Sequence, residues 1–154
     1  MKMKIGAAVL MLLAAAPAFA QNGLNTVKPV ISDQDLVISI DEVTENALFY
    51  PVDIGGTRVE VLAVKAPDGT IRTAFNTCQS CYGSGRGFYK QQGTVLVCQN
   101  CGKRFRMSQV EVRSGGCNPV PIFKDDKTVR GNTITISKEY LARARDIFAR
   151  WKRS

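Results

Sequence analysis

The chain has 154 residues, with 21 Lys or Arg, 13 Asp or Glu, five Cys and no His. The absence of histidine excludes Ser-His-Asp and Cys-His catalytic units, imidazole proton transfer and histidine metal ligands. It also excludes the haem attachment signature C-x-x-C-H, although two C-x-x-C motifs are present. Because histidine is absent, acid–base or metal chemistry would fall to Cys, carboxylates, Tyr or Lys. The length and the 45% hydrophobic content suit one folded domain.

The start of the chain carries the pattern of a secretory signal peptide. A positively charged segment, Met1 to Lys4, precedes an apolar run from Ile5 to Ala16, and Ala18-Phe19-Ala20 matches the A-x-A cleavage pattern. An uncleaved anchor is the alternative, but the run is shorter than the about 20 apolar residues that span a bilayer. We therefore predict that residues 1–20 are a signal peptide and that the mature chain, starting at Gln21, is periplasmic or otherwise extracytoplasmic.

The next part of the chain is expected to be a linker followed by a β-rich domain. Residues 21–34 contain Asn, Gly, Pro and Ser without strong periodicity and are interpreted as the linker, so the domain would span residues 35–154. Gly55-Gly56 predicts a hairpin turn, and Pro67-Asp68-Gly69 predicts a second turn. Apolar runs and alternation predict strands at 36–40, 47–54, 57–65, 70–75, 94–97, 110–113 and 133–136.

The C-terminal part, residues 138–152, is predicted to form a helix with Ser137 as its N-cap. Apolar residues at 3, 4, 3 spacing form a stripe that is expected to pack on the sheet: Leu141, Ala144, Phe148 and Trp151. The opposite face is basic and carries Arg143, Arg145, Arg150, Lys152 and Arg153. A solvated surface explains such a face in the ordinary case, and contact with an anionic partner or a membrane surface is the alternative.

The cysteines carry the clearest chemical signal. Cys78-x-x-Cys81 and Cys98-x-x-Cys101 are separated by sixteen residues, a spacing typical of two loops that place four sulfurs around one tetrahedral metal. Disulfides and a thioredoxin-type redox pair are the alternatives, but the motifs lie in Gly-rich loops between strands and not at a helix start. Cys117 lies in a Gly-Gly-Cys-Asn-Pro loop and could be a further ligand, a redox partner or a plain thiol.

Charge is distributed unevenly along the chain. Residues 21–77 hold four basic and eight acidic residues, whereas residues 78–117 hold six basic residues and one acidic residue. Cations near thiolates lower the pKa of the thiols and offset the negative charge of a thiolate-bound metal, although ordinary solvated cations would look the same in sequence. Because export separates the chain from nucleic acid, no nucleic-acid partner is expected.

Three segments carry a resemblance to a known family. They are Phe75-Asn76-Thr77-Cys78-x-x-Cys81-Tyr82, Val97-Cys98-x-Asn100-Cys101-Gly102 and Gly115-Gly116-Cys117-Asn118-Pro119-Val120-Pro121. With them, the stretch from Asp41 to Tyr140 resembles the FtrD-like domain of bacterial membrane-associated or exported iron–sulfur proteins. The resemblance implies a metal or iron–sulfur module for extracytoplasmic redox work, in some relatives alongside iron uptake. It implies as ligands Cys78, Cys81, Cys98 and Cys101, with Cys117 as a further member of the motif.

A second, more distant resemblance concerns the fold. The order of hairpin, Asp-Gly turn, two ligand loops and Pro-containing loop is similar to that of a Rieske domain. Rieske centres use two Cys and two His, and both His are missing here. The expected fold class is therefore mainly β: a small Rieske-like antiparallel β-domain with two metal-binding C-x-x-C loops and a C-terminal helix.

Two functions from different classes follow from these observations. The first is a periplasmic electron carrier with an iron–sulfur centre, working with a redox partner or membrane protein of a redox or iron-uptake system. The second is a structural zinc module, in which four thiolates close the coordination sphere. Thiol exchange or copper binding through soft sulfur remains a third alternative. No paired carboxylates or activated nucleophile indicate an enzyme, and no motif indicates a small-molecule substrate.

Overall fold

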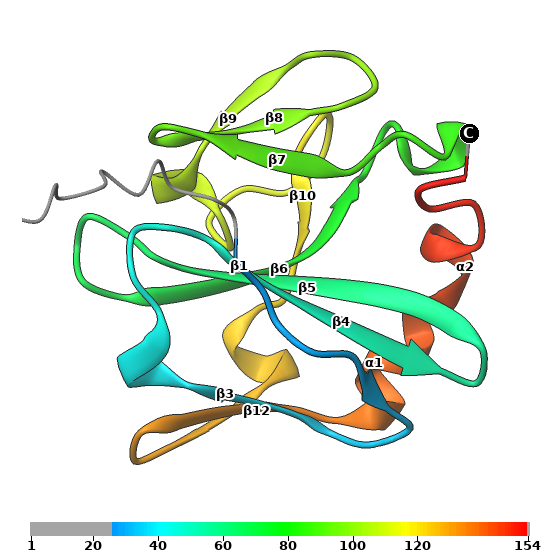
Figure 1. The fold of residues 1–154 in the computed structure, drawn as a ribbon. Coiled ribbons are helices and arrows are strands. Elements are labelled where there is room, and N and C mark those ends of the chain that lie inside the picture. Colours follow the sequence, from blue (N-terminus) through cyan, green and yellow to red (C-terminus); the bar gives the residue numbers. More distant parts are fainter. Residues whose placement is uncertain (1–25, 154) are drawn as a thin grey trace, which may run out of the picture.

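The computed structural model describes residues 26–153, which form the predicted mainly β fold with a short helical tail (Figure 1). The predicted signal peptide lies outside the described residues. A central six-stranded sheet has the order β1-β4-β5-β6-β10, with β2 also paired to β4. Its strands are β1 (Thr26–Val27), β2 (Ile31–Ser32), β4 (Leu48–Ile54), β5 (Thr57–Lys65), β6 (Ile71–Cys78) and β10 (Pro119–Pro121).

Two three-stranded antiparallel sheets lie on opposite sides of the central sheet (Figure 1). One contains β3 (Leu36–Ser39), β11 (Thr128–Arg130) and β12 (Thr133–Ile136). The other contains β7 (Tyr89–Gln92), β8 (Val95–Cys98) and β9 (Arg104–Arg106). The helical elements are α1 (Lys138–Arg143), α2 (Arg145–Phe148) and the short 3-10 turns η1 (Ile40–Glu42), η2 (Tyr82–Ser84), η3 (Met107–Gln109) and η4 (Lys124–Asp126).

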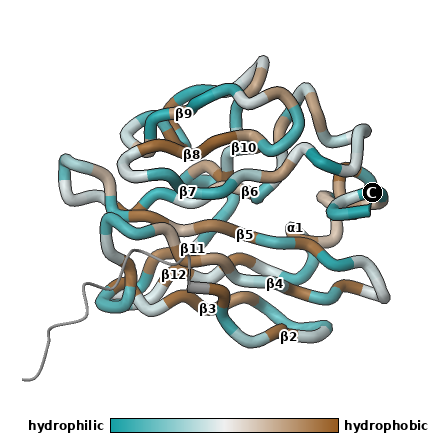
Figure 2. The backbone as a smooth tube through the Cα atoms, turned by 45° about the horizontal axis from the view of Figure 1, so that its top comes forward, coloured by the Kyte–Doolittle hydropathy of each residue, from teal (hydrophilic) through white to brown (hydrophobic). Residues whose placement is uncertain are grey.

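The central sheet is buried on both faces: all of β4 except Asp53 is buried, and so are residues 59–64 of β5. Figure 2 shows a hydrophobic stretch along part of β5. Because successive side chains on a strand point to opposite faces, Val59 and Val61 enter one core, whereas Leu62 and Val64 enter the other. The first core lies toward β3 and β12 and includes Ile38, Ile134 and Ile136. The second lies toward β7–β9 and includes Tyr89, Leu96 and Phe105.

Both predicted turns form. Asp53 pairs with Arg58 across the β4–β5 hairpin, and the loop residues Gly55 and Gly56 have φ values of 56° and 78°. A two-residue hairpin loop with positive φ at both positions is the turn that matches strand twist, and glycine adopts it without strain. In the next turn Gly69 has a φ of 83°, and Asp68 accepts hydrogen bonds from the backbone and the hydroxyl of Thr70.

The C-terminal segment forms two short helices where the sequence predicted one. Ser137 accepts a hydrogen bond from the Tyr140 N–H at 3.2 Å, so the predicted N-cap is confirmed. At Ala144 the N–H bonds to the carbonyl of Leu141, three residues earlier, and the same tight turn recurs between Trp151 and Phe148. This tightening places the Trp151 indole N–H 2.8 Å from the carbonyl of Asn76 on β6. The predicted apolar stripe is buried, and the basic residues opposite it are exposed.

Two local predictions are wrong. Residues 110–113 do not form a strand: they follow η3, and the N–H groups of Val112 and Arg113 both bond to the carbonyl of Gln109. Only Val110 of that segment is buried, and Val112 is 61% exposed. The segment interpreted as a linker contains β1 and β2, which pair in parallel with β4. The edge of β4 presents unpaired N–H and C=O groups, and these can recruit short segments of low intrinsic strand propensity.

Within residues 26–153, none of the helices combines the length and the apolar character needed to cross a bilayer.

Candidate metal centre

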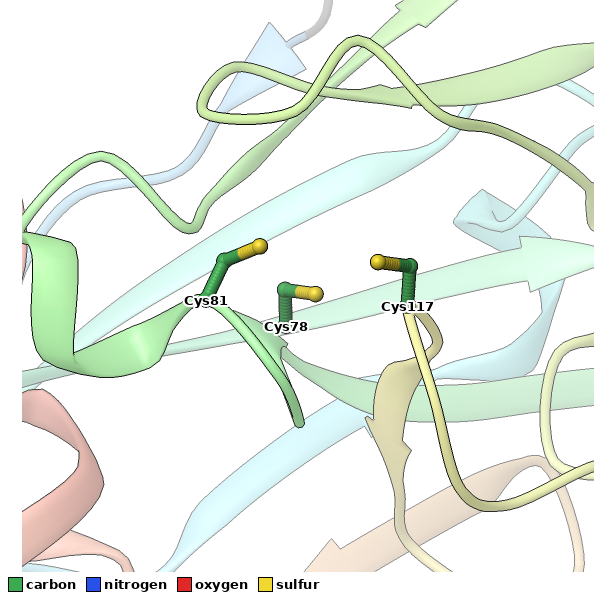
Figure 3. A group of neighbouring side chains, drawn as sticks. All are labelled: Cys78, Cys81 and Cys117. Carbon is green, nitrogen blue, oxygen red and sulfur yellow. The ribbon is translucent and has the colours of Figure 1, made fainter.

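Three segments bring the five cysteines of the chain to one place, between the central sheet and β7–β9. Cys78 ends β6 and Cys81 immediately precedes η2, while Cys98 ends β8 and Cys101 follows it by one turn. Cys117 comes from the loop that leads into β10. Figure 3 shows the sulfurs of Cys78, Cys81 and Cys117 directed toward a common space.

The sulfurs form two overlapping groups of three. In each group the sulfur atoms lie within 4.8 Å of one another, and the groups are Cys78, Cys81, Cys117 and Cys81, Cys98, Cys101. Cys81 belongs to both, and the Sγ atoms of Cys101 and Cys117 are 3.5 Å apart. Among the described residues no set of four cysteines meets this mutual distance, and all five are free thiols. The structure thus brings Cys117 beside the four cysteines of the two C-x-x-C motifs.

Backbone hydrogen bonds close the turn of each C-x-x-C loop. The first turn closes with a hydrogen bond of 3.1 Å from the Cys81 N–H to the Cys78 carbonyl, and the second with one of 2.9 Å from the Gly102 N–H to the Cys98 carbonyl. Gly102 has a φ of 71°, which an L side chain adopts only with strain. Such turns leave backbone N–H groups free to donate to the sulfurs.

Strand register then brings the loops together. Tyr89 is paired with Cys98 across β7 and β8, and Pro119 is paired with Cys78 across β10 and β6. The loop after the first motif must also pass very close to it, because a Cβ built on Gly87 would lie 2.5 Å from the Cys81 carbonyl carbon. Only glycine fits this approach, which lets the Gly87 carbonyl accept a hydrogen bond of 2.6 Å from the Cys78 N–H.

The thiols differ in their tendency to ionise. Burial raises the pKa of Cys81, and it raises the pKa of Cys98 to about 12. The backbone N–H of Lys103 donates to the exposed Cys101 sulfur and lowers the pKa of Cys101 to about 7. The hydrogen bond with Cys101, together with burial, raises the pKa of Cys117 to about 12. Since only thiolates bind metal strongly, a metal must displace several protons as it enters this site.

Tyr89 is a site residue that the sequence interpretation missed. Its hydroxyl donates to the carbonyl of Cys117 at 2.9 Å and also lies within hydrogen-bonding reach of the Cys78 sulfur. Burial opposes ionisation of Cys78, but hydrogen bonds from Tyr89 and from the N–H groups of Ser80 and Cys81 outweigh it and lower the pKa of Cys78. The available signal was a hydroxyl-bearing aromatic residue between the two motifs.

The loop that carries Cys117 is held by a buried ion pair. The Glu111 carboxylate accepts hydrogen bonds from the Lys127 ammonium at 2.5 Å and from the Thr73 N–H at 2.9 Å. The side chains of Lys127 and Glu111 are only 4% and 14% exposed. Arg72 adds hydrogen bonds of 3.3 Å to the carbonyls of Ser108 and Val110 in the same loop. The path of the chain toward Cys117 is therefore fixed by β6 and not by the cysteines alone.

The basic residues within 78–117 are exposed. Glu111, the single acidic residue of this range, is paired with Lys127 and does not offset their charge. Arg86, Lys103, Arg104, Arg106 and Arg113 all reach solvent. Glu111 is taken up by Lys127, and Arg86 approaches the second motif directly through a 3.3 Å hydrogen bond to the Gln99 carbonyl. A cation bound to a cysteine loop in this way suits thiolates and their metal complexes.

A family model described as "Membrane iron-sulfur containing protein FtrD-like" matches residues 43–148, which is more than half of the chain. This chain belongs to the FtrD-like family. The match covers all five cysteines and extends through Phe148, beyond the Tyr140 limit of the resemblance in sequence. No curated protein and no solved structure matches the chain, so the distant similarity to Rieske domains stays a prediction.

The residues present fit a thiolate-bound metal centre. The site offers five soft sulfur donors, three of them buried, and Figure 3 shows three of the five pointing inward. Backbone N–H groups donate to the sulfurs of Cys78, Cys98 and Cys101, which stabilises negative charge on them. Cysteine clusters of this kind, in a member of this family, are compatible with an iron–sulfur centre.

Proposed function

We propose that this chain is an exported electron-transfer protein that holds an iron–sulfur cluster with the cysteines of its two C-x-x-C loops. In this proposal it works outside the cytoplasm with a redox partner or membrane protein and carries electrons without transforming a substrate itself. The observation that carries the proposal is the meeting of five sulfurs from three loops in two overlapping groups. Membership of a family whose description names membrane iron–sulfur proteins supports it.

The spread of the sulfurs favours a cluster over a single ion. A tetrahedral zinc with sulfurs at about 2.3 Å holds all four of them within about 4 Å of one another. The two groups here share only Cys81, so the donors reach over a wider space than one such ion needs. An iron–sulfur cluster has several iron atoms with separate cysteine ligands, and it supplies one-electron chemistry when bound.

The protein's own residues would tune and connect such a centre. Backbone N–H groups donate hydrogen bonds to the sulfurs, and donors of this kind raise reduction potentials by stabilising the electron-rich state. The Tyr89 hydroxyl, which donates to the Cys117 carbonyl, lies within reach of the Cys78 sulfur. Cys78 and Cys98 are 0% and 1% exposed, whereas Cys101 is exposed. Cys101 therefore offers the edge at which a partner would approach.

A structural zinc site is the second candidate, favoured by the position of the cysteines. Cys78 and Cys117 belong to the central sheet and its loops, whereas Cys98 and Cys101 belong to β8 and the turn after it. A metal between them would fasten β7–β9 to the central sheet and stabilise the second core, as structural zinc does in small domains.

Metal analysis of the chain isolated from its native compartment without refolding tests the proposal. Iron and acid-labile sulfide, with a visible absorption band that bleaches on dithionite addition, are the expected results. Zinc in place of iron, with no visible band, would replace the proposal with the structural site. The same measurement on Ser variants of each of the five cysteines identifies the ligands, with Ser80→Ala as a matched control inside the first loop. Metal-free native protein with intact disulfides would overturn both candidates.

The mature N-terminus tests the proposed export. We expect the intact mass of the periplasmic protein to correspond to a chain that begins at Gln21. A species that keeps Met1 in the soluble fraction would contradict this.

A further inference from the structure

A cavity of about 580 Å³ lies beside the metal centre, on the face of the central sheet that β7 covers. Its size falls within the range of small-molecule sites, and its apolar wall includes Phe49, Phe88 and Tyr89. Tyr89 belongs to both places, since it lines the cavity and its hydroxyl meets the cysteine loops. The C-terminal tail closes another side of the cavity with Lys152.

A buried carboxylate lies in this cavity. Glu60 is 3% exposed, although carboxylates are rarely buried without full pairing. Asn76 donates to its Oε1 atom at 2.7 Å, and Lys152 approaches the same atom at 3.5 Å. Both interactions use Oε1, so Oε2 retains its capacity to accept a hydrogen bond from a ligand. Asn76 also bonds the backbone N–H and carbonyl of Tyr89, which fixes the carboxylate relative to the metal centre.

The charged groups around the cavity are otherwise cationic. Arg86, Lys90 and Lys152 line it, against the single carboxylate of Glu60. The Lys152 ammonium lies 5.2 Å from the ring centroid of Phe88 and 4.1 Å from that of Trp151, which holds it at the aromatic wall. An aromatic ring with an anionic group would therefore find an apolar wall and opposite charge in the same place.

We propose that this cavity binds a small aromatic anion that also carries a hydroxyl or amine donor. The ring packs against Phe49 and Phe88, the anionic group pairs with Lys152 and its neighbouring cations, and the donor bonds to Glu60. None of the five cysteines, which all lie in the described part of the chain, lines this cavity.

Three related naphthalenes test these contacts separately by calorimetric titration of the metal-containing chain. 6-Hydroxynaphthalene-2-sulfonate carries both groups, naphthalene-2-sulfonate lacks the donor, and 2-naphthol lacks the anion. We expect the first to bind most tightly and the other two to bind about tenfold more weakly, because each loses one charge-assisted contact. Equal affinities for all three, or no binding at millimolar concentration, would overturn the proposal.

Substitutions show which residue accounts for each loss of affinity. Lys152→Gln should weaken both sulfonates about tenfold and leave 2-naphthol unchanged, whereas Glu60→Gln should weaken only the two hydroxyl-bearing probes. Lys124→Gln, an exposed lysine outside the cavity, is the control and should change nothing. If Glu60→Gln does not fold, Lys152→Gln and the probe series still decide the question. Sulfonate binding that is insensitive to Lys152→Gln would refute the assigned site.

Discussion

The two faces of the central sheet are packed in different ways. Toward β3 and β12, the core consists of aliphatic and aromatic side chains and is closed by Leu141, Phe148 and Trp151. Phe75 stacks on Tyr140 and meets Phe148 edge to face in this core. Toward β7–β9, the core is smaller and includes three of the five cysteines.

The difference shows how each face obtains its stability. On the first face, burial of apolar surface itself stabilises the fold, at about 25 cal/mol per Å². On the second face, three buried cysteines and the partly buried Cys117 lie among the apolar side chains of the core. Metal binding to such a site contributes directly to folding stability, so the second face should depend on its ligand and the first should not.

Removal of the metal should give the largest difference in stability between the two faces of the central sheet. We expect a chelator to abolish hydrogen-exchange protection in β7 and β8 while β3 and β12 keep theirs. The reason is that β8 ends at a proposed metal ligand, Cys98, whereas β3 and β12 contain no cysteine. Hydrogen exchange measured by mass spectrometry, with and without the chelator, checks this. Cys98→Ser should reproduce the effect without chelator. Equal loss of protection on both faces would show that they fold as one unit.

Removal of a buried aromatic ring from the core toward β3 and β12 should lower the free energy of unfolding without changing metal content. Phe148→Ala removes a ring that is 3% exposed and should lower the free energy of unfolding by about 3–5 kcal/mol. Chemical denaturation measures the loss, and metal content per folded chain should stay unchanged. The charge reversal Arg145→Glu with Arg150→Glu, on the exposed face of the same segment, should change stability by less than about 1 kcal/mol. If Phe148→Ala leaves the free energy of unfolding unchanged, the apolar stripe contacts a partner or a membrane and not the core.

The ion pair that holds the Cys117 loop should give an intermediate effect. Glu111→Gln leaves the buried Lys127 ammonium without its counter-charge but keeps an acceptor oxygen, and it should cost about 2 kcal/mol of unfolding free energy. Urea unfolding measures this cost, and the double variant Glu111→Gln with Lys127→Met should recover most of it. If the single variant is as stable as the parent chain, the pair does not anchor the loop.

The smallest expected effect is a difference in alkylation rate between two thiols, Cys101 and Cys98, in the metal-free chain. Because the pKa of Cys101 is lowered to about 7, its thiolate is half formed near neutral pH, and its alkylation rate should level off above about pH 8. Cys98, whose pKa of about 12 results from burial at the end of β8, should react slowly up to pH 10 for as long as β8 stays folded in the metal-free chain. Iodoacetamide labelling followed by peptide mass spectrometry across pH 6–10 compares the two thiols. Faster labelling of Cys98 at pH 7 would contradict the order.

Much of the fold followed from local sequence. Gly55-Gly56, Pro67-Asp68-Gly69 and the apolar runs predicted the β4–β5–β6 meander, because these turns need particular backbone conformations and these strands are long. The short strands β7, β9, β10 and β11 were not predicted. Polar composition and three- to four-residue length leave β7 and β9 without a periodic signal, and Pro119 and Pro121 argue against a strand at β10.

The sequence by itself determined the donor chemistry, the mainly β class and the residues that close the first core. Two C-x-x-C motifs, the absence of histidine and an apolar stripe at helical spacing are properties of the chain that need no folding to be read. Tertiary structure alone decided that Cys117 lies 3.5 Å from Cys101, that Tyr89 meets the cysteine loops, and that Glu60 lies buried in a cavity beside them. These contacts join segments that are far apart in sequence through strand register, which no local pattern of residues encodes.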